Sequence, residues 1–272
     1  MTDKTHVDLS GSPETMLATL YAKAVDASAS DSVLHDHYAA DIVARIEYDW
    51  AKTGIKASNA AGVAMRSMHF DTWARQFLAV HTYAVVLHLG CGLDSRYFRL
   101  APPAGVAWYD VDYPAVIALR ERFYPRAERY QLVAASVTDP EWTASIPADK
   151  PTLILGEGLT MYLTKQDGVA LFRRLVQHFA SGEIQFDAFN RLGIRSQWTN
   201  TVVRRSGSKL YWAIDNPSDF LDAVPGTRLL SYVPVLESVA TSKLNRPYRL
   251  MAAVMNRVPG VRTIAQFHRY AF

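Results

Sequence analysis

Residues 85–99 read VVLHLGCGLDSRYFR, and this stretch decides the fold. Its apolar run from Val85 to Leu89 predicts a short buried strand, and Gly90-Cys91-Gly92 predicts a tight turn directly after it. A helix is expected to open within Leu93–Arg96. In α/β sheets, a strand that passes through a glycine turn into a helix brings its backbone close to a nucleotide-like ligand. Glycine suits this turn because a Cβ would obstruct both the turn and the approach of the ligand.

The dinucleotide-binding pattern GxGxxG is incomplete here, because Ser95 occupies the position of its third glycine. This disfavours NAD, whose pyrophosphate is held at the helix N-terminus. A cofactor without a pyrophosphate does not need that anion site, and S-adenosylmethionine is such a cofactor. An NAD-dependent oxidoreductase stays as an alternative.

Composition limits the classes of protein to consider. The chain has 272 residues, of which 49% are hydrophobic and 20% charged, the balance of a globular protein with a sizeable core. The net charge is +3 and the basic residues are scattered, so a nucleic-acid partner is not expected. A polar start and the lack of long apolar runs argue against a signal peptide and a membrane span. Cys91 is the only cysteine, which excludes an intrachain disulfide and a cysteine-based zinc site. These features predict a cytoplasmic protein.

The first eighty or so residues are expected to form three helices. Ser12-Pro13 marks the start of the first, which runs to about Val25, because serine caps helices and proline suits the first helical position. The second is predicted over Asp31–Asp49 and the third over about Ser58–His81.

From Ala84 onward, short apolar strands alternate with helices, the pattern of a parallel sheet that is covered on both faces. The strands are predicted at Ala84–Leu89, Val106–Val111, Tyr130–Ala134, Thr152–Leu155, Ile184–Phe189, Arg228–Val233 and Val261–Tyr270. Helices are predicted between them, for example at Tyr113–Phe123 and Lys165–Ala180. One α/β domain with a helical N-terminal cap is expected, rather than two independent domains.

Three groups of side chains follow strands at the edge where ligands bind in such sheets. Asp110 and Asp112 end the second strand about twenty residues after the glycine turn, and Asp112 is the better candidate to accept from ribose hydroxyls because the strand must stop there. The alternative is that one or both aspartates cap the next helix. Ser136 and Val137 follow the third strand and offer backbone groups to an adenine, or else form a plain turn.

Glu157 lies between two glycines directly after the fourth strand. A buried carboxylate is costly there unless it has a partner or water, so Glu157 is a site candidate together with nearby Tyr162. The alternative reading is a structural turn with Tyr162 in the core. Asp94 and Arg96 are expected to form a structural ion pair, although Asp94 is also placed to cap a helix, and His88 is expected to be a satisfied core histidine.

Four strings occur in an order and spacing that resemble the leucine carboxyl methyltransferase family, and in particular its tetracenomycin-type polyketide O-methyltransferase branch. They are VVLHLGCGLDSRYFRL, WYDVDYPAVIALR, SVTDPEWTASI and GEGLTMYL. The resemblance covers about Met16 to Phe272 and is strongest between Arg66 and Leu163. It implies a Rossmann-like class I methyltransferase fold: a mostly parallel seven-stranded sheet with helices on both faces and a helical N-terminal cap.

The resemblance also implies S-adenosylmethionine as cofactor and assigns its contacts. Arg66 and Lys23 match the cations that hold the methionine carboxylate, although residues alone would leave both as solvated helix charges. Gly90 and Gly92 match the glycine turn, Asp112 the ribose acid and Glu157 the glutamate of the EG motif. The adenine-edge pair falls on Ser136 and Val137, where the leucine carboxyl methyltransferases have Asp-Leu.

This assignment divides the single domain into a helical cap (1–82), a cofactor-binding core (83–190) and substrate-side helices with C-terminal strands (191–272). The expected activity is methyl transfer to a carboxylate or phenolic hydroxyl of a small molecule. A carboxylate is ionised at pH 7 and needs no general base, whereas a phenol would be helped by one, with Asp187 or a histidine as candidates.

Tyr162 and Arg191, with Arg195 beside it, are candidates to orient the acceptor. A protein substrate is also possible, but it is disfavoured by the length of the chain. A protein that binds the cofactor without turnover, as a partner or regulator, is the alternative from another class.

Overall fold

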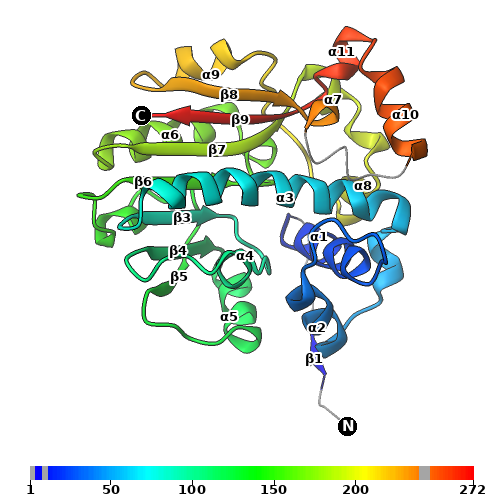
Figure 1. Ribbon diagram of the computed structural model, residues 1–272, viewed down its shortest axis with the longest axis horizontal. Helices are drawn as coiled ribbons and strands as arrows, with labels where there is room; N and C mark the ends of the chain where they lie inside the picture. Colours follow the sequence, from blue (N-terminus) through cyan, green and yellow to red (C-terminus); the bar gives the residue numbers. More distant parts are fainter. Residues whose placement is uncertain (1–3, 8–11, 239–245) are drawn as a thin grey trace.

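The computed structural model describes residues 4–7, 12–238 and 246–272, and its centre is one seven-stranded sheet (Figure 1). The strand order is β5-β4-β3-β6-β7-β9-β8. β3, β4, β5, β6 and β7 are mutually parallel, and β9 runs antiparallel to both of its neighbours. The strands are β3 (Val85–Leu89), β4 (Ala107–Asp112), β5 (Tyr130–Ala134), β6 (Thr152–Gly156), β7 (Gly182–Phe189), β8 (Arg228–Pro234) and β9 (Ala265–Ala271). The predicted mostly parallel seven-stranded sheet is confirmed.

The two faces of the sheet bury alternate side chains of the same strands, as the pleat requires. Val85, Leu87 and Leu89 of β3 pack into a core with α6 (Lys165–His178) and α9 (Pro217–Ala223). Val86 points to the other face, into a core with α3 (Ala57–Val80), which crosses the sheet in Figure 1. Every residue of β3 is buried, because this strand lies near the middle of the sheet with helices on both sides.

The N-terminal cap contains α1 (Ser12–Ala27) and α2 (His37–Arg45), which pack together at one end of the strands (Figure 1). The prediction of one helix over Asp31–Asp49 is wrong at both ends. The Asp26 carboxylate accepts hydrogen bonds from the backbone N–H groups of Val33 and Leu34, so the chain turns there before α2 begins. Beyond α2, β2 (Ile46–Glu47) pairs with β1 (Thr5–His6), and the short helix η1 (Trp50–Thr53) follows.

The helix after the glycine turn, α4 (Arg96–Leu100), begins at the last residue of the stretch predicted to open it. Two other predicted boundaries shift. The helix predicted from Tyr113, α5 (Pro114–Phe123), begins one residue later, at its proline. Residues 259–262 form the short helix α11 (Pro259–Arg262), so β9 starts only at Ala265. The remaining elements are η2 (Trp142–Ser145), η3 (Thr160–Tyr162), α7 (Arg191–Arg195), η4 (Gln197–Thr199), α8 (Thr201–Ser206), η5 (Val235–Glu237) and α10 (Arg246–Met255).

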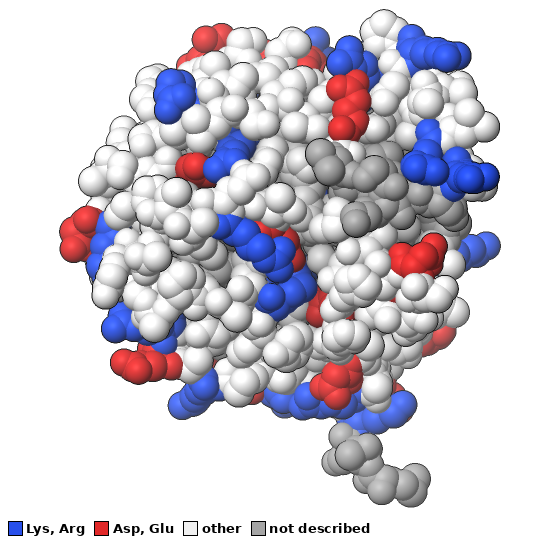
Figure 2. Space-filling view, viewed as in Figure 1, with Lys and Arg blue, Asp and Glu red and all other residues white. Residues whose placement is uncertain are grey.

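Among the described residues, no helix combines the length and the apolar character that a membrane crossing requires. On the face that Figure 2 shows, basic side chains are dispersed, with acidic ones among them.

Candidate functional site

A cavity of about 520 Å³ opens at the carboxyl ends of β3, β4 and β6. The cap closes it from one side, through Met16, Thr19 and Lys23 of α1. Asn200 and the start of α8 contribute another wall, and Arg205 of α8 fixes this wall to the cap by donating to the carbonyl oxygen of Ala51 at 2.7 Å. The cavity therefore lies between the sheet, the N-terminal helices and the segment after β7.

The glycine turn forms the floor of the cavity and has the backbone conformation that glycine allows. Gly90 and Gly92 have φ values of 62° and 52°, in the left-handed region. A Cβ on Gly90 would lie 3.2 Å from Leu159, and one on Gly92 would lie 2.8 Å from Met16. The N–H of Gly90 donates to the carbonyl of Val111 at 2.8 Å, so the turn is held against β4.

The two aspartates of β4 have different roles. Asp112 lines the cavity and accepts hydrogen bonds from the backbone N–H of Gly92 and that of Tyr113, both at 2.8 Å. Burial raises the pKa of Asp112 despite these donors. Asp110 is fully buried below the cavity and pairs with Arg120 of α5. The structure thus brings Asp112, not Asp110, to the site.

Arg66 of α3 joins the ends of two strands at the cavity. Its Nε donates to Glu157 at 3.0 Å and its Nη1 to Asp187 at 3.2 Å. Burial disfavours the charge of Arg66, but the two carboxylates outweigh this effect and raise its pKa above the ordinary value. Ser67 donates to the same oxygen of Glu157 at 2.8 Å, so α3 holds this carboxylate twice. Burial raises the pKa of Asp187, in the opposite direction to the effect of Arg66.

Lys23 of α1 forms a buried ion pair with Asp94 at 2.9 Å. Asp94 also pairs with Arg96 at 3.4 Å and with Arg99 at 2.9 Å. Although burial opposes its ionisation, these three cations, Lys23 foremost, hold the pKa of Asp94 well below its usual range. The expected ion pair of Asp94 with Arg96 is therefore present within a larger network, and Asp94 is not a helix cap, since the N-cap of α4 is Ser95.

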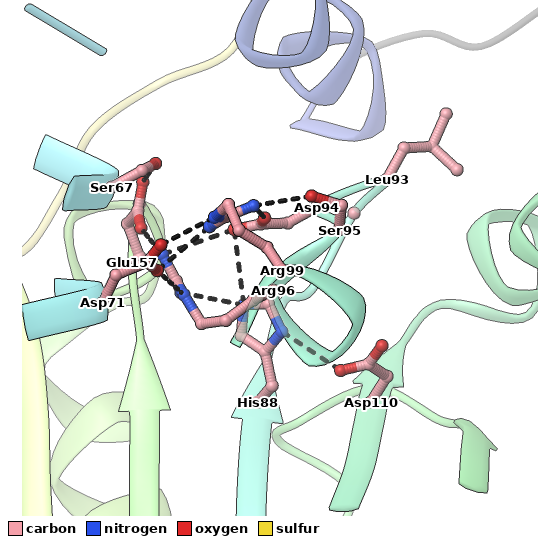
Figure 3. A network of polar contacts seen from close by, with 12 residues as sticks. Ser67, Asp71, His88, Leu93, Asp94, Ser95, Arg96, Arg99, Asp110 and Glu157 are labelled. Carbon is pink, nitrogen blue, oxygen red and sulfur yellow. Dashed lines mark hydrogen bonds and ion pairs between the residues drawn. The ribbon is translucent and has the colours of Figure 1, made fainter. Parts of the chain in front are cut away.

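Figure 3 shows this network, which connects α3, α4 and the strand ends beneath the cavity. Arg96 bonds to Asp71 at 2.9 Å and to Glu157, and it donates to Nε2 of His88 at 3.2 Å. Because Nε2 accepts from a guanidinium, the proton of His88 lies on Nδ1 and is donated to Asp110 at 3.1 Å. His88 is thus a satisfied core histidine, as expected.

Sequence reasoning missed several members of this network. Arg99 bridges Asp71 of α3, at 2.6 Å, to Asp36 at the start of α2, at 3.0 Å. Arg120 likewise went unassigned, although it interrupts the apolar face of α5, where an arginine needs a buried partner. That interruption was the available signal.

The remaining predicted residues are divided between the cavity and the surface. Ser136, Val137 and Tyr162 line the cavity, and burial raises the pKa of Tyr162. Arg191 does not: its side chain is 75% exposed and pairs with Asp215 at 3.2 Å. Arg195, on the same short helix, is also exposed and outside the cavity lining.

Known proteins match both the sequence and this architecture. The sequence profile described as leucine carboxyl methyltransferase matches residues 15–176. This chain belongs to the leucine carboxyl methyltransferase family. S-adenosylmethionine is the cofactor of the family, so the predicted family and cofactor are confirmed.

Two curated relatives extend the match beyond the profile. The tetracenomycin polyketide synthesis O-methyltransferase TcmP of Streptomyces glaucescens is 38% identical over 266 residues, which cover 98% of each chain. The S-adenosyl-L-methionine-dependent methyltransferase dpfgK of Gibberella zeae is 36% identical over 259 residues, covering 88% of this chain and 87% of the relative. A solved structure of a putative methyltransferase from Thermobifida fusca has the same fold, with a TM-score of 0.61 at 14% identity, covering 92% of this chain and 93% of that one.

The cavity residues of this leucine carboxyl methyltransferase family member fit the cofactor chemically. S-adenosylmethionine carries a carboxylate, a ribose diol and a purine. The cavity offers the cations Lys23 and Arg66, the carboxylate of Asp112 and the two glycines Gly90 and Gly92, which have no Cβ. The carboxylate and the ribose diol of the cofactor therefore each have a complementary group in the lining.

Proposed function

We propose that this protein is an S-adenosylmethionine-dependent O-methyltransferase whose acceptor is a carboxylate or a phenolic hydroxyl of a small, polyketide-like molecule. One observation carries the proposal: Lys23, Arg66, the glycine turn, Asp112 and Glu157 line one cavity. The similarity to TcmP over nearly the whole of both chains supports oxygen as the accepting atom. We also propose that the cap, the core and the C-terminal part act as one domain.

In this proposal, different residues of the cavity bind different parts of the cofactor. Lys23 and Arg66 hold its carboxylate, Asp112 accepts from the ribose hydroxyls, and Ser136 and Val137 lie against the base. Gly90 and Gly92 let the backbone approach. Glu157 orients Arg66, to which it is bonded at 3.0 Å. When bound, the cofactor supplies a methyl group on an activated sulfonium, so the protein mainly contributes alignment and electrostatics.

The acceptor lies, in this proposal, between the cap and the segment 199–203. Ile55, Val63 and Phe189 give this part of the cavity an apolar wall, and Tyr162 adds a hydroxyl. Tyr162 is therefore proposed to orient the acceptor. Arg191 is not proposed for this role, because it lies outside the lining and pairs with Asp215. An acceptor carboxylate is ionised at pH 7 and needs no base. For a phenol, Asp187, which accepts from Arg66 at 3.2 Å, or the histidine His88 of the lining is the candidate base.

Titration calorimetry with S-adenosylmethionine and S-adenosylhomocysteine tests the cofactor site, and a methyl-transfer assay on a panel of acids and phenols tests the reaction. Binding of both compounds with transfer to one panel class is the expected result. Binding without transfer to any acceptor would favour a non-catalytic partner or regulatory protein. A folded protein that binds neither compound, but binds NADH, would point to an oxidoreductase instead.

A further inference from the structure

An apolar stripe on α10 is left uncovered by the rest of the described chain. Its members are Leu250, Met251 and Val254, which are 70%, 49% and 55% exposed, and Val258 just beyond the helix, which is 52% exposed. The helix is attached to the fold by another side, where Ala252 is buried. Single exposed apolar side chains are common on protein surfaces, but four that adjoin one another indicate a surface for contact.

The charges that border this stripe are basic. Arg246 and Arg249 of α10 and Arg257 directly after it are exposed. Beyond Glu237 the sequence contains five arginines and one lysine but no acidic residue. Glu237 itself pairs with Arg262. The helix is therefore amphipathic in an unusual way, because its exposed side combines apolar side chains with cations.

The charge pattern argues against a second copy of this chain as the occupant. A two-fold contact uses the same patch on both copies, so it would place the arginines of one α10 against those of the other. Like charges that face one another across an interface cost free energy. The sequence beyond Glu237 supplies no carboxylate that could separate them.

The position of α10 favours a bilayer over a protein partner. α10 and α11 project at a corner of the molecule (Figure 1). A bilayer surface yields to a projecting helix, whereas a protein partner would need a groove that matches it. With 10 residues, α10 is too short to cross a bilayer, so it would lie in the interface. There the apolar side chains reach the acyl chains while the arginines stay at the headgroups.

We propose that α10 and the turn after it bind the surface of an anionic lipid bilayer. Two contributions act together: insertion of the apolar stripe, and attraction of Arg246, Arg249 and Arg257 to acidic headgroups. Because the second contribution is electrostatic, binding weakens as the salt concentration rises. The protein would thus work as a peripheral protein of such a surface, whichever acceptor it methylates.

The test is co-sedimentation of the full chain with lipid vesicles. One set contains phosphatidylcholine alone, and the other contains equal parts of phosphatidylcholine and phosphatidylglycerol. The wild-type protein is expected to bind the mixed vesicles about tenfold more tightly or better. The double variants Leu250→Ser/Val254→Ser and Arg246→Gln/Arg249→Gln are each expected to weaken this binding by about tenfold or more.

Two control variants make the same changes elsewhere on the surface. Arg126→Gln/Arg129→Gln removes two exposed cations before β5, and Val80→Ser replaces a side chain that is 74% exposed at the end of α3. Both controls are expected to bind the mixed vesicles like the wild type. Calorimetry with S-adenosylhomocysteine on every variant tests the cofactor site separately, so failure of this proposal is distinguished from failure of the proposed function.

Three results would overturn the proposal. Equal affinity for the two vesicle sets would show that acidic headgroups are not recognised. Variants of α10 that bind like the wild type would place the contact elsewhere. A protein that binds neither vesicle set would leave the stripe to another protein, and a dimer that Leu250→Ser/Val254→Ser dissociates would identify that protein as a second copy.

Discussion

Arg120 and Gly92 are joined by a hydrogen bond of 2.8 Å from the guanidinium Nη1 to the carbonyl oxygen of the turn. The same nitrogen donates to the carbonyl of Asp94 at 2.9 Å, while Nη2 pairs with Asp110. Arg120 is fully buried, so this cation on α5 supports the glycine turn from beneath the cavity. The conformation of the turn thus depends on a residue that does not line the site.

Replacing Arg120 is expected to lower the free energy of unfolding of the chain substantially. Arg120→Met leaves the buried carboxylate of Asp110 without its cation, although His88, Trp108 and Tyr130 still donate to it, and such a loss costs about 3–5 kcal/mol. Urea unfolding followed by circular dichroism measures the loss. The double variant Asp110→Asn/Arg120→Met removes both charges and is expected to be more stable than the single one. A single variant within about 1 kcal/mol of wild type would show that the pair is not a support of the fold.

Gly90→Val is expected to abolish binding of S-adenosylhomocysteine. Valine is strained at a φ of 62°, and its Cβ would press on Leu159 at 3.2 Å beside the cavity. Gly62→Val on α3 is the matched control, because a Cβ there meets nothing within 4 Å. Calorimetry on both variants decides the matter: a Gly90→Val protein that binds normally would show that the turn does not face the ligand.

Arg66→Ala is expected to weaken cofactor binding by on the order of 1.5–3 kcal/mol, the worth of a charge-assisted hydrogen bond. Arg66→Lys keeps the charge but loses the two-pronged contact with Glu157 and Asp187, so an intermediate affinity is expected. Thermal unfolding checks that each variant is folded. Unchanged affinity in a folded Arg66→Ala protein would remove this arginine from the cofactor site.

Stability is expected to rise with pH between about 4 and 6.5, partly because of His69. Burial lowers the pKa of His69 to about 4 from its ordinary value of 6.5, so unfolding in this window takes up a proton. The unfolded state then binds more protons than the folded one, and the slope from this histidine reaches about 1.4 kcal/mol per pH unit.

The variant His69→Phe isolates this contribution. Phenylalanine keeps the ring contacts with Trp73 and Phe267, whose ring centroids lie 4.2 and 4.3 Å from that of His69. Losing the hydrogen bond to Ser238 shifts stability at every pH, whereas losing the titration flattens the slope. Urea unfolding at several pH values separates the two effects. Parallel curves for the variant and the wild type would refute a role for His69 in the pH dependence.

Much of the fold was predictable because its strands are short apolar runs between turns, and a buried parallel sheet needs such runs. The helix over Asp31–Asp49 failed for a local reason. Asp26 lies outside the predicted segment, yet its carboxylate captures the N–H groups of Val33 and Leu34. Such a contact from seven residues away leaves no trace in the periodicity of the segment itself.

The candidate site was predictable where it follows strand ends and hidden where helices contribute. Asp112 and Glu157 follow strands, so position alone indicated them. Lys23 looks like a surface lysine in its own sequence, yet it is 2% exposed, because Asp94 lies across a tertiary contact. Only the resemblance to the family indicated Lys23 and Arg66. Arg191 was placed by proximity to β7, but its helix turns the side chain toward Asp215 and solvent.

The ionic network beneath the cavity is complete among protein groups alone: Asp71, Asp94 and Glu157 already have their cations. A charged ligand that arrives above it meets dipoles and charges that need not rotate. The free energy of orienting them is incurred once, when the chain folds, rather than in every catalytic cycle. The stability of the fold and the speed of the chemical step therefore both depend on this one arrangement of side chains.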